Sequence, residues 1–161
     1  MHKAVMTERS DSDDKCYFAE TYTPALLAQA SQLISAEFHV IVQNNGFTIS
    51  DWRVLSTLSS GKPMSIGELA QISVTKQSTV TRLLDRLESQ GYVKRLPHAS
   101  DRRITLITAT PRGKRMTASL ITEAKAHEDI VLAPLGKEKS DELRATLRLL
   151  IKLHRTPQTP I

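Results

Sequence analysis

The sequence predicts a mainly α-helical fold with a small β-hairpin wing, in which a winged helix-turn-helix module is flanked by N- and C-terminal dimerisation helices. Two short helices with start signals follow one another closely between residues 65 and 90. A β-branched hairpin at residues 92–108 comes next, and long amphipathic segments lie on both sides. A short helix, a tight turn, a second helix and a hairpin in this order are typical of the winged helix-turn-helix.

The composition is that of a folded protein, since 40% of the 161 residues are hydrophobic and 24% are charged. No apolar run approaches the ~18 residues that cross a bilayer, and the N-terminal MHKAVMTERSDSDDK does not resemble a signal peptide. We therefore expect a cytoplasmic protein without a membrane partner, with a flexible polar tail at residues 1–21 and a C-terminal tail at 156–161. The single cysteine, Cys16, can form neither an internal disulfide nor a CxxC-type zinc site, and we expect no metal and no cofactor.

Long amphipathic helices are predicted at both ends of the chain. An apolar stripe with three- to four-residue spacing runs over residues 24–44. Residues 110–132 form a second long helix that begins with a threonine N-cap and a proline, and a last helix with heptad-like leucines follows a break at 134–136. These helices are apolar over a wide arc. We therefore expect 22–46 and 111–155 to be dimerisation helices that bury this arc against a second copy of the chain.

The helix-turn-helix elements are predicted within a DNA-binding domain at residues 47–110. Thr48 is an N-cap with Asp51 three residues on, and Ser65 with Glu68 forms a capping box. Each pair marks the start of a short helix.

The recognition helix is predicted from Lys76 to Gln90, with Thr75 as its N-cap and Gly91 closing its C-terminus. One face is polar, and the other carries an apolar stripe at i, i+3, i+4 and i+7 formed by Val80, Leu83, Leu84 and Leu87.

The wing is predicted directly after this helix. Residues 92–96 and 103–108 read as two antiparallel strands, and residues 97–101 read as the turn between them. The hairpin tip is basic.

Positive charge gathers on this module. Between Thr75 and Arg115 there are ten basic and three acidic residues, a net charge of +7, whereas the rest of the chain carries −2. A basic block on a near-neutral remainder indicates a polyanionic partner such as double-stranded DNA.

The run from Trp52 to Gly113 resembles the MarR family of bacterial transcription regulators. The segment LLDRLESQGYVKR resembles the second half of the family's recognition helix and its first wing strand. DRR at residues 101–103 matches the D-x-R signature of the wing, and TPRG at 110–113 matches the start of the next helix. Ala109 departs from the family's usual leucine, which removes some packing at the junction but leaves the DNA surface alone.

Side-chain chemistry and this resemblance together indicate which residues contact DNA. In the major groove, glutamine can read adenine and arginine can read guanine, so Gln77 and Arg82 are candidate base contacts. The resemblance implies that Arg103 enters the minor groove, and we expect Asp101 either to orient this arginine or to hold the turn rather than to contact DNA. Hydroxyl, basic and imidazole side chains can contact phosphates or complete the helix start, and these candidates are Ser65, Thr75, Lys76, Ser78, Thr79, Thr81, Arg86, His98 and Arg102.

For two of these candidates, a purely structural role is an alternative to a contact with DNA. Thr79 can be a partly buried hydroxyl. Arg86 can be an exposed partner of Asp85 or Glu88 on its own helix, the interpretation that we favour slightly.

The resemblance also implies a homodimeric repressor of a pseudo-palindromic operator, regulated by a small aromatic or phenolic acid. His39, Trp52 and Arg53 are candidates for that ligand site, but we favour Trp52 as a core residue and His39 as a solvent-facing residue of its helix.

Three other functions compete with this one. A winged helix used only for protein contacts would need an acidic partner for the +7 segment. Cysteine-based redox sensing through Cys16 is a second alternative, and we do not favour it because this residue lies upstream of the position of the family's sensing cysteine. An enzyme is not expected, since the sequence has no HExxH, GxSxG, P-loop or GxGxxG motif.

Overall fold

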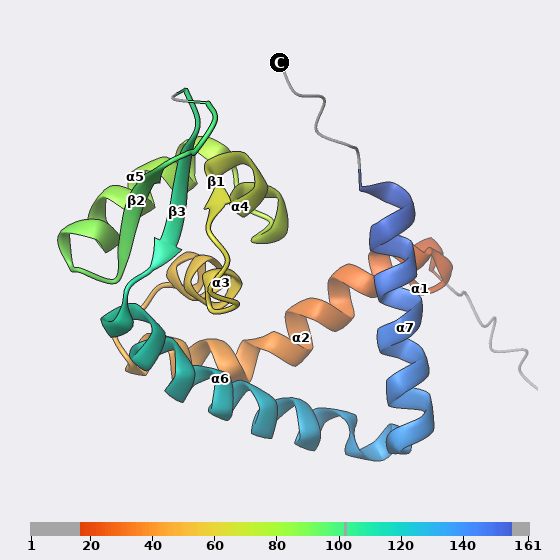
Figure 1. Cartoon of the computed structure of the whole chain (residues 1–161). Helices are drawn as coiled ribbons and strands as arrows, with labels where there is room; N and C mark the ends of the chain where they lie inside the picture. Colours follow the sequence, from red (N-terminus) through yellow and green to blue (C-terminus); the bar gives the residue numbers. More distant parts are fainter. Residues whose placement is uncertain (1–16, 102, 156–161) are drawn as a thin grey trace, which may run out of the picture. The chain divides into compact units, whose positions relative to one another are not determined.

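The computed structural model describes residues 17–101 and 103–155, which fall into two compact units that divide after Ala36 (Figure 1). Each unit is described by itself. The predictions made for Cys16, Arg102 and the tail at 156–161 lie outside the described residues.

The N-terminal unit contains a short helix where the sequence analysis expected a flexible tail. Helix α1 spans Phe18–Thr21, so the predicted tail at residues 1–21 is wrong for this stretch. The backbone N–H of Tyr17 donates to the Glu20 carboxylate over 3.1 Å. The rings of Phe18 and Tyr22 stack with 4.9 Å between their centroids. These local contacts stabilise a single helical turn. The turn is too short to show the apolar periodicity by which longer helices are predicted.

Helix α2, Thr23–Asn44, begins in the first unit and ends in the second. By length and composition alone it could cross a membrane, which the sequence analysis did not expect; a single such helix is weak evidence. Many of its apolar side chains are exposed in the single chain, among them Leu26, Leu33 and Val40.

The second unit contains the winged helix-turn-helix module. Its elements are α3 (Ile49–Leu58), β1 (Met64–Ser65), α4 (Ile66–Ile72), α5 (Gln77–Ser89), β2 (Val93–Pro97) and β3 (Thr105–Ala109).

The predicted hairpin is part of a three-stranded antiparallel sheet with the order β1-β3-β2. Strand β1 pairs Met64 with Ile107 and Ser65 with Leu106. It escaped the sequence analysis because two residues are too short to show alternation. The third strand fixes the base of the wing beside the start of α4.

The N-caps of α3 and α4 form as predicted. The Thr48 hydroxyl accepts from the Asp51 backbone N–H over 3.1 Å, and the Ser65 hydroxyl accepts from that of Glu68 over 3.2 Å. The prediction for α5 is wrong by one residue, because its N-cap is Lys76. The Thr75 hydroxyl donates instead to the Ser73 carbonyl over 3.0 Å, inside the turn that joins α4 to α5.

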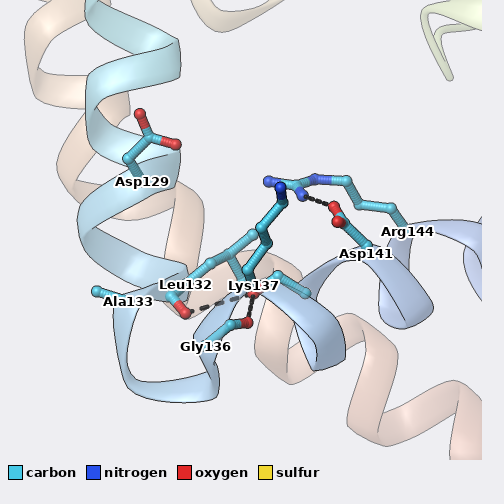
Figure 2. A pocket seen from close by; sticks show the side chains of 8 residues that line it. Asp129, Leu132, Ala133, Gly136, Lys137, Asp141 and Arg144 are labelled. Atoms are coloured by element: carbon cyan, nitrogen blue, oxygen red, sulfur yellow. Dashed lines mark hydrogen bonds and ion pairs between the residues drawn. The ribbon is translucent and has the colours of Figure 1, made fainter.

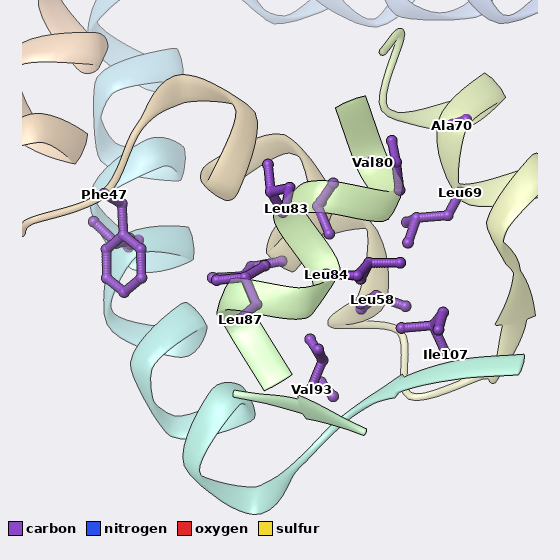
Figure 3. Packing of buried hydrophobic residues seen from close by; sticks show 14 of the residues in the cluster. Phe47, Leu58, Leu69, Ala70, Val80, Leu83, Leu84, Leu87, Val93 and Ile107 are labelled. Carbon is purple, nitrogen blue, oxygen red and sulfur yellow. The ribbon is translucent and has the colours of Figure 1, made fainter. Parts of the chain in front are cut away.

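The core of the module lies under α5 (Figure 3). Val80, Leu84 and Leu87 are fully buried, and Leu83 is nearly so. They pack in one cluster with side chains from α3, α4 and β3, which include Leu58, Leu69 and Ile107. Burying this stripe leaves the opposite face of α5 to the solvent.

The module continues into α6 (Pro111–Leu132), a 3-10 turn (Ala133–Leu135) and α7 (Gly136–His154). The Thr110 hydroxyl caps α6 by accepting from the Gly113 N–H over 3.1 Å, and it donates to the Gly91 carbonyl over 2.7 Å. The cap therefore also ties the start of α6 to the end of α5. The predicted break near Pro134 is confirmed.

Candidate DNA-binding site

The outer face of α5 is polar and exposed, as predicted. Lys76, Gln77, Ser78, Thr81 and Arg82 are all exposed, and they follow one another over the first two turns. The Thr81 hydroxyl donates to the Gln77 carbonyl over 3.0 Å and keeps its lone pairs for an external donor. Thr79 is half-buried, in agreement with its structural interpretation.

The turn before α5 is tight. Val74 has φ +51°, a left-handed conformation that is costly for a β-branched residue, and its side chain is 80% exposed. The buried Ser73 hydroxyl closes α4 by donating to the Leu69 carbonyl over 2.6 Å. This turn fixes the angle at which α5 leaves α4.

Ser65 is less available to a phosphate than the sequence suggested. Its hydroxyl donates to the Glu68 carboxylate over 2.8 Å while it accepts from the Glu68 N–H. The structure therefore shows Ser65 in a capping role.

Arg86 pairs with a residue that the sequence analysis did not consider. Its guanidinium forms an ion pair with Asp51, on α3, rather than with Asp85 or Glu88. Asp51 is fully buried and also accepts from the Thr48 N–H over 2.8 Å. The pair therefore ties the recognition helix to α3 across 35 residues of sequence.

Arg95, on β2, joins the wing to the recognition helix. Its guanidinium donates to Asp85 over 2.7 Å and also binds Glu88. Its backbone N–H donates to Glu88 over 3.1 Å. The hydrogen bond that Arg95 donates to Asp85, together with the charge of Glu88, raises the pKa of Arg95 above its usual value. The charge of Arg95 is thus neutralised within the protein, by two acidic residues that the net charge of +7 already includes.

At the wing tip, Asp101 orients Arg103 as predicted. The guanidinium of Arg103 donates to both carboxylate oxygens of Asp101, each over 3.2 Å, and its backbone N–H donates over 2.9 Å. These bonds hold the pKa of the Asp101 carboxyl below its usual value, the side-chain bond contributing most. The Arg103 side chain is 85% exposed and is therefore presented outward while its direction is set.

His98 begins the same turn, and its ring is bound to the backbone. Nδ1 accepts from the N–H of Asp101 over 3.2 Å and from that of Ser100 over 3.3 Å. The sequence predicted a phosphate contact for His98 and did not foresee this backbone role.

A hollow of about 440 Å³ lies between α3 and α6. Of the three candidate ligand-site residues, Trp52 lines this hollow, whereas Arg53 and His39 are not among its lining residues. The sequence analysis missed the other members, because they are brought together only by the packing of α3 against α6. These are Ser56, Ser59, Ile121, Ala124, Lys125 and Glu128.

A second hollow lies at the corner between α6 and α7 (Figure 2). Arg144 crosses it, binding Asp141 over 3.0 Å and Glu128 over 3.4 Å. The Ser140 hydroxyl donates to the Gly136 carbonyl over 2.7 Å. Of these bonds, the ion pair of Arg144 with Glu128 joins α7 to α6, and the other two lie within α7.

The exposed face of α5 beside a wing with a directed arginine defines a winged helix-turn-helix DNA-binding module. The model of the MarR family matches residues 47–105, the span from the start of α3 to the wing. A MarR family transcriptional regulator from Silicibacter pomeroyi DSS-3 has a similar structure, with a TM-score of 0.76, 31% identity, and coverage of 87% of this chain and 100% of that one.

Two further relatives are similar over most of their length. The homoprotocatechuate degradative operon repressor of Escherichia coli is 28% identical, over 88% of this chain and 95% of its own. The structure of NadR in complex with 4-hydroxyphenylacetate has a TM-score of 0.77 and 26% identity, over 83% of this chain and 94% of that one. The chain belongs to the MarR family. It is a DNA-binding transcription regulator and not an enzyme.

Proposed function

We propose that the protein is a ligand-responsive repressor of the cytoplasm that binds a pseudo-palindromic operator as a homodimer. The proposal rests on one observation. A single module presents two elements that can contact DNA, which we call the two readers. The first is the exposed face of α5, and the second is Arg103, directed by Asp101 at the wing tip. The bonds of Arg95 hold the wing strand against α5, which supports their action as one unit.

In this proposal α5 lies in the major groove and the wing tip enters the minor groove. Gln77 and Arg82 contact base edges. Lys76, Ser78 and Thr81 contact phosphates near the positive end of the helix, and Thr79 supports them. Arg103 lies in the narrow minor groove, where the negative potential is strongest. Arg102 and His98 are the remaining phosphate candidates, and Arg86 acts through its bond to Asp51.

The first experiment identifies the DNA. Bound fragments are selected from a genomic library, and their affinity is measured by electrophoretic shift over a range of salt concentrations. We expect a steep loss of affinity with salt, because contacts to phosphates release counterions. No shift with any fragment at low salt would support the alternative of a protein-interaction module.

Arginine variants then test the two readers. Arg103→Ala is expected to lower the affinity strongly without unfolding the protein. Arg82→Ala is expected to change the preferred sequence as well as the affinity, whereas a uniform loss over all sequences would make Arg82 a phosphate anchor. Unchanged affinity of Arg103→Ala would contradict the role of the wing.

The homodimer is supported by the exposed apolar side chains of α2 and α7. Leu33 is 75% exposed on α2, and Leu153 is 67% exposed on α7. Large apolar surfaces on a single chain mark association sites. Two modules related by a twofold axis would present their recognition helices about 34 Å apart, one turn of DNA.

The effector is proposed to be a small phenolic acid bound in the hollow between α3 and α6. The Trp52 ring can stack on an aromatic ligand, Ser56 can bind a hydroxyl, and Lys125 can pair with a carboxylate. A structural relative binds 4-hydroxyphenylacetate, and another relative represses a homoprotocatechuate operon.

Trp52 is the single tryptophan of the chain, so its fluorescence reports on this hollow. Titration with 4-hydroxyphenylacetate is expected to change that fluorescence and to release DNA. Lys125→Ala should weaken both effects, and Arg53→Ala, outside the lining, is the matched control. Equal binding by both variants would remove Lys125 from the site.

A further inference from the structure

The ring of His98 is the start of a chain of hydrogen bonds that ends at Arg103. Nδ1 of His98 accepts from the backbone N–H groups of Asp101 and Ser100, over 3.2 Å and 3.3 Å. The Asp101 carboxylate in turn accepts from the guanidinium and the backbone N–H of Arg103. The residue that fixes Asp101 therefore acts on the direction of the wing arginine.

Backbone bonds alone define this turn incompletely. The His98 N–H donates to the Ile104 carbonyl over 3.2 Å, and the Ile104 N–H donates to the Asp101 carbonyl over 3.1 Å. The N–H groups of Ser100 and Asp101 receive their acceptor from the His98 ring. In a longer strand pairing these N–H groups would donate to backbone carbonyls. Here the His98 imidazole takes the place of that acceptor.

The two N–H donors fix the protonation of the ring. A nitrogen that accepts must carry its lone pair, so Nδ1 is unprotonated and the neutral ring bears its proton on Nε2. A proton on Nδ1 would turn the acceptor into a donor and set it against the two N–H groups, and only the Ser100 hydroxyl, 3.3 Å away, could then accept from it. The bonds that hold the turn are therefore available only to the neutral ring.

We propose that His98 is a positioning residue of the wing, whose ring, unprotonated at Nδ1, holds the backbone of Ser100 and Asp101 and through Asp101 places Arg103 in the minor groove. The proposal rests on the proposed function in one respect, the entry of Arg103 into DNA. It differs from a phosphate contact by His98, which would be strengthened by protonation.

The charged groups around His98 come from the turn and from strand β2. Among the described wing residues, the charged neighbours of His98 in the turn are Asp101 and Arg103, and those on β2 are Lys94 and Arg95. Strands β1 and β3 carry no titratable side chain. Because Arg103 lowers the pKa of Asp101, that carboxylate stays ionised over the whole range of the experiment, from about pH 8 to about pH 5.5.

The experiment compares wild type, His98→Ala and His98→Asn on the highest-affinity duplex recovered by selection. The Asn amide oxygen can take the place of Nδ1, and it does not titrate. At about pH 8, His98→Ala should lose roughly five- to tenfold in affinity, the size expected from one or two lost hydrogen bonds, and His98→Asn should recover most of it. Between about pH 8 and pH 5.5, wild type should lose affinity relative to His98→Asn.

A double-mutant cycle tests whether His98 acts through Arg103. In the Arg103→Ala background, His98→Ala should cause little further loss, because the effect is transmitted by the missing arginine. A full additional loss would show a separate contact with DNA. A gain of wild type over His98→Asn at low pH would overturn the proposal in favour of a charged phosphate contact.

A measurement without DNA separates this proposal from the proposed function. Nitrogen-15 NMR should show His98 protonated on Nε2 at about pH 8. The Ser100 and Asp101 amides should be protected from hydrogen exchange in wild type and His98→Asn but not in His98→Ala. Protection that is equal in all three proteins would overturn the positioning role even if DNA binding is confirmed.

Discussion

At the scale of single residues, Gly113 shows how closely the chain packs where the wing joins α6. A Cβ built on Gly113 would lie 2.0 Å from the carbonyl oxygen of Tyr92, closer than any real contact. The TPRG match marked this glycine by resemblance, and the structure supplies its reason. The carbonyl also accepts from the backbone N–H of Thr110 over 3.0 Å, so it is not free to move aside.

Gly113→Ala is therefore expected to destabilise the protein by about 3 kcal/mol or more, since overpacking against fixed backbone costs at least the upper end of the usual range. Gly46→Ala is the matched control, because nothing lies within 4 Å of its Cβ and only its φ of +80° is unfavourable. We expect that control to cost about 1 kcal/mol. Urea unfolding measures both, and equal losses would contradict the steric explanation.

Local signals predicted some of the site residues and missed others for a physical reason. The D-x-R spacing predicted that Asp101 orients Arg103, because the two are close in sequence. Thr75 carries a good capping side chain, yet the tight turn at Val74 directs its hydroxyl to the Ser73 carbonyl. The backbone geometry of this turn is set by the packing of α4 against α5. That packing cannot be predicted from the side chain of any single residue.

At the scale of elements, α5 is held on two sides by ion pairs. Asp51 joins it to α3 through Arg86, and Asp85 and Glu88 join it to β2 through Arg95. The helix and its apolar stripe were predictable from periodicity. The partner of Arg86 was not, because it lies 35 residues away and becomes a neighbour only in the folded chain.

Asp51→Ala is expected to destabilise the protein by about 2–4 kcal/mol, since it removes the α3 cap and the partner of Arg86 together. Arg86→Gln should cost less, because the Arg86 side chain is 46% exposed and its charge is partly screened. Thermal unfolding with circular dichroism compares the two. A larger loss from Arg86→Gln would mean that the pair, and not the cap, dominates.

The neutralisation of Arg95 leads to a prediction about salt. Lys76→Ala should reduce the slope of log affinity against log salt by about one, as expected when one phosphate contact is lost. Arg95→Ala should lower the affinity by weakening the attachment of the wing to α5. The slope should stay unchanged, because Asp85 and Glu88 already neutralise the charge of Arg95. Shift assays at several salt concentrations give both slopes. A reduced slope for Arg95→Ala would place that arginine on the DNA.

At the scale of the whole molecule, the fold class followed from the order of elements, whereas the assembly depends on surfaces that one chain leaves uncovered. The second unit buries its own core, which runs from Phe38 on α2 through the module to Leu120 on α6. Helix α7 does not, since of its 19 residues only Ser140 is buried. So little burial in the single chain, together with leucines over a wide arc, supports the proposed dimer.

Exchanging apolar for charged side chains on these faces tests the proposed dimer. Leu33→Glu on α2 combined with Leu153→Glu on α7 should give a monomer in sedimentation experiments, because two charges would have to be buried in the interface. Operator affinity should fall by orders of magnitude, since each module would then bind its half-site alone. Arg148→Glu also introduces a glutamate at an exposed position of α7, but on its polar side, about 140° around the helix from Leu153, and it should leave the dimer unchanged. Because the module has its own core, the monomeric variant should retain the sharp unfolding transition of α3 to β3. A dimer that survives both leucine substitutions would place the contact between the two copies on a different surface.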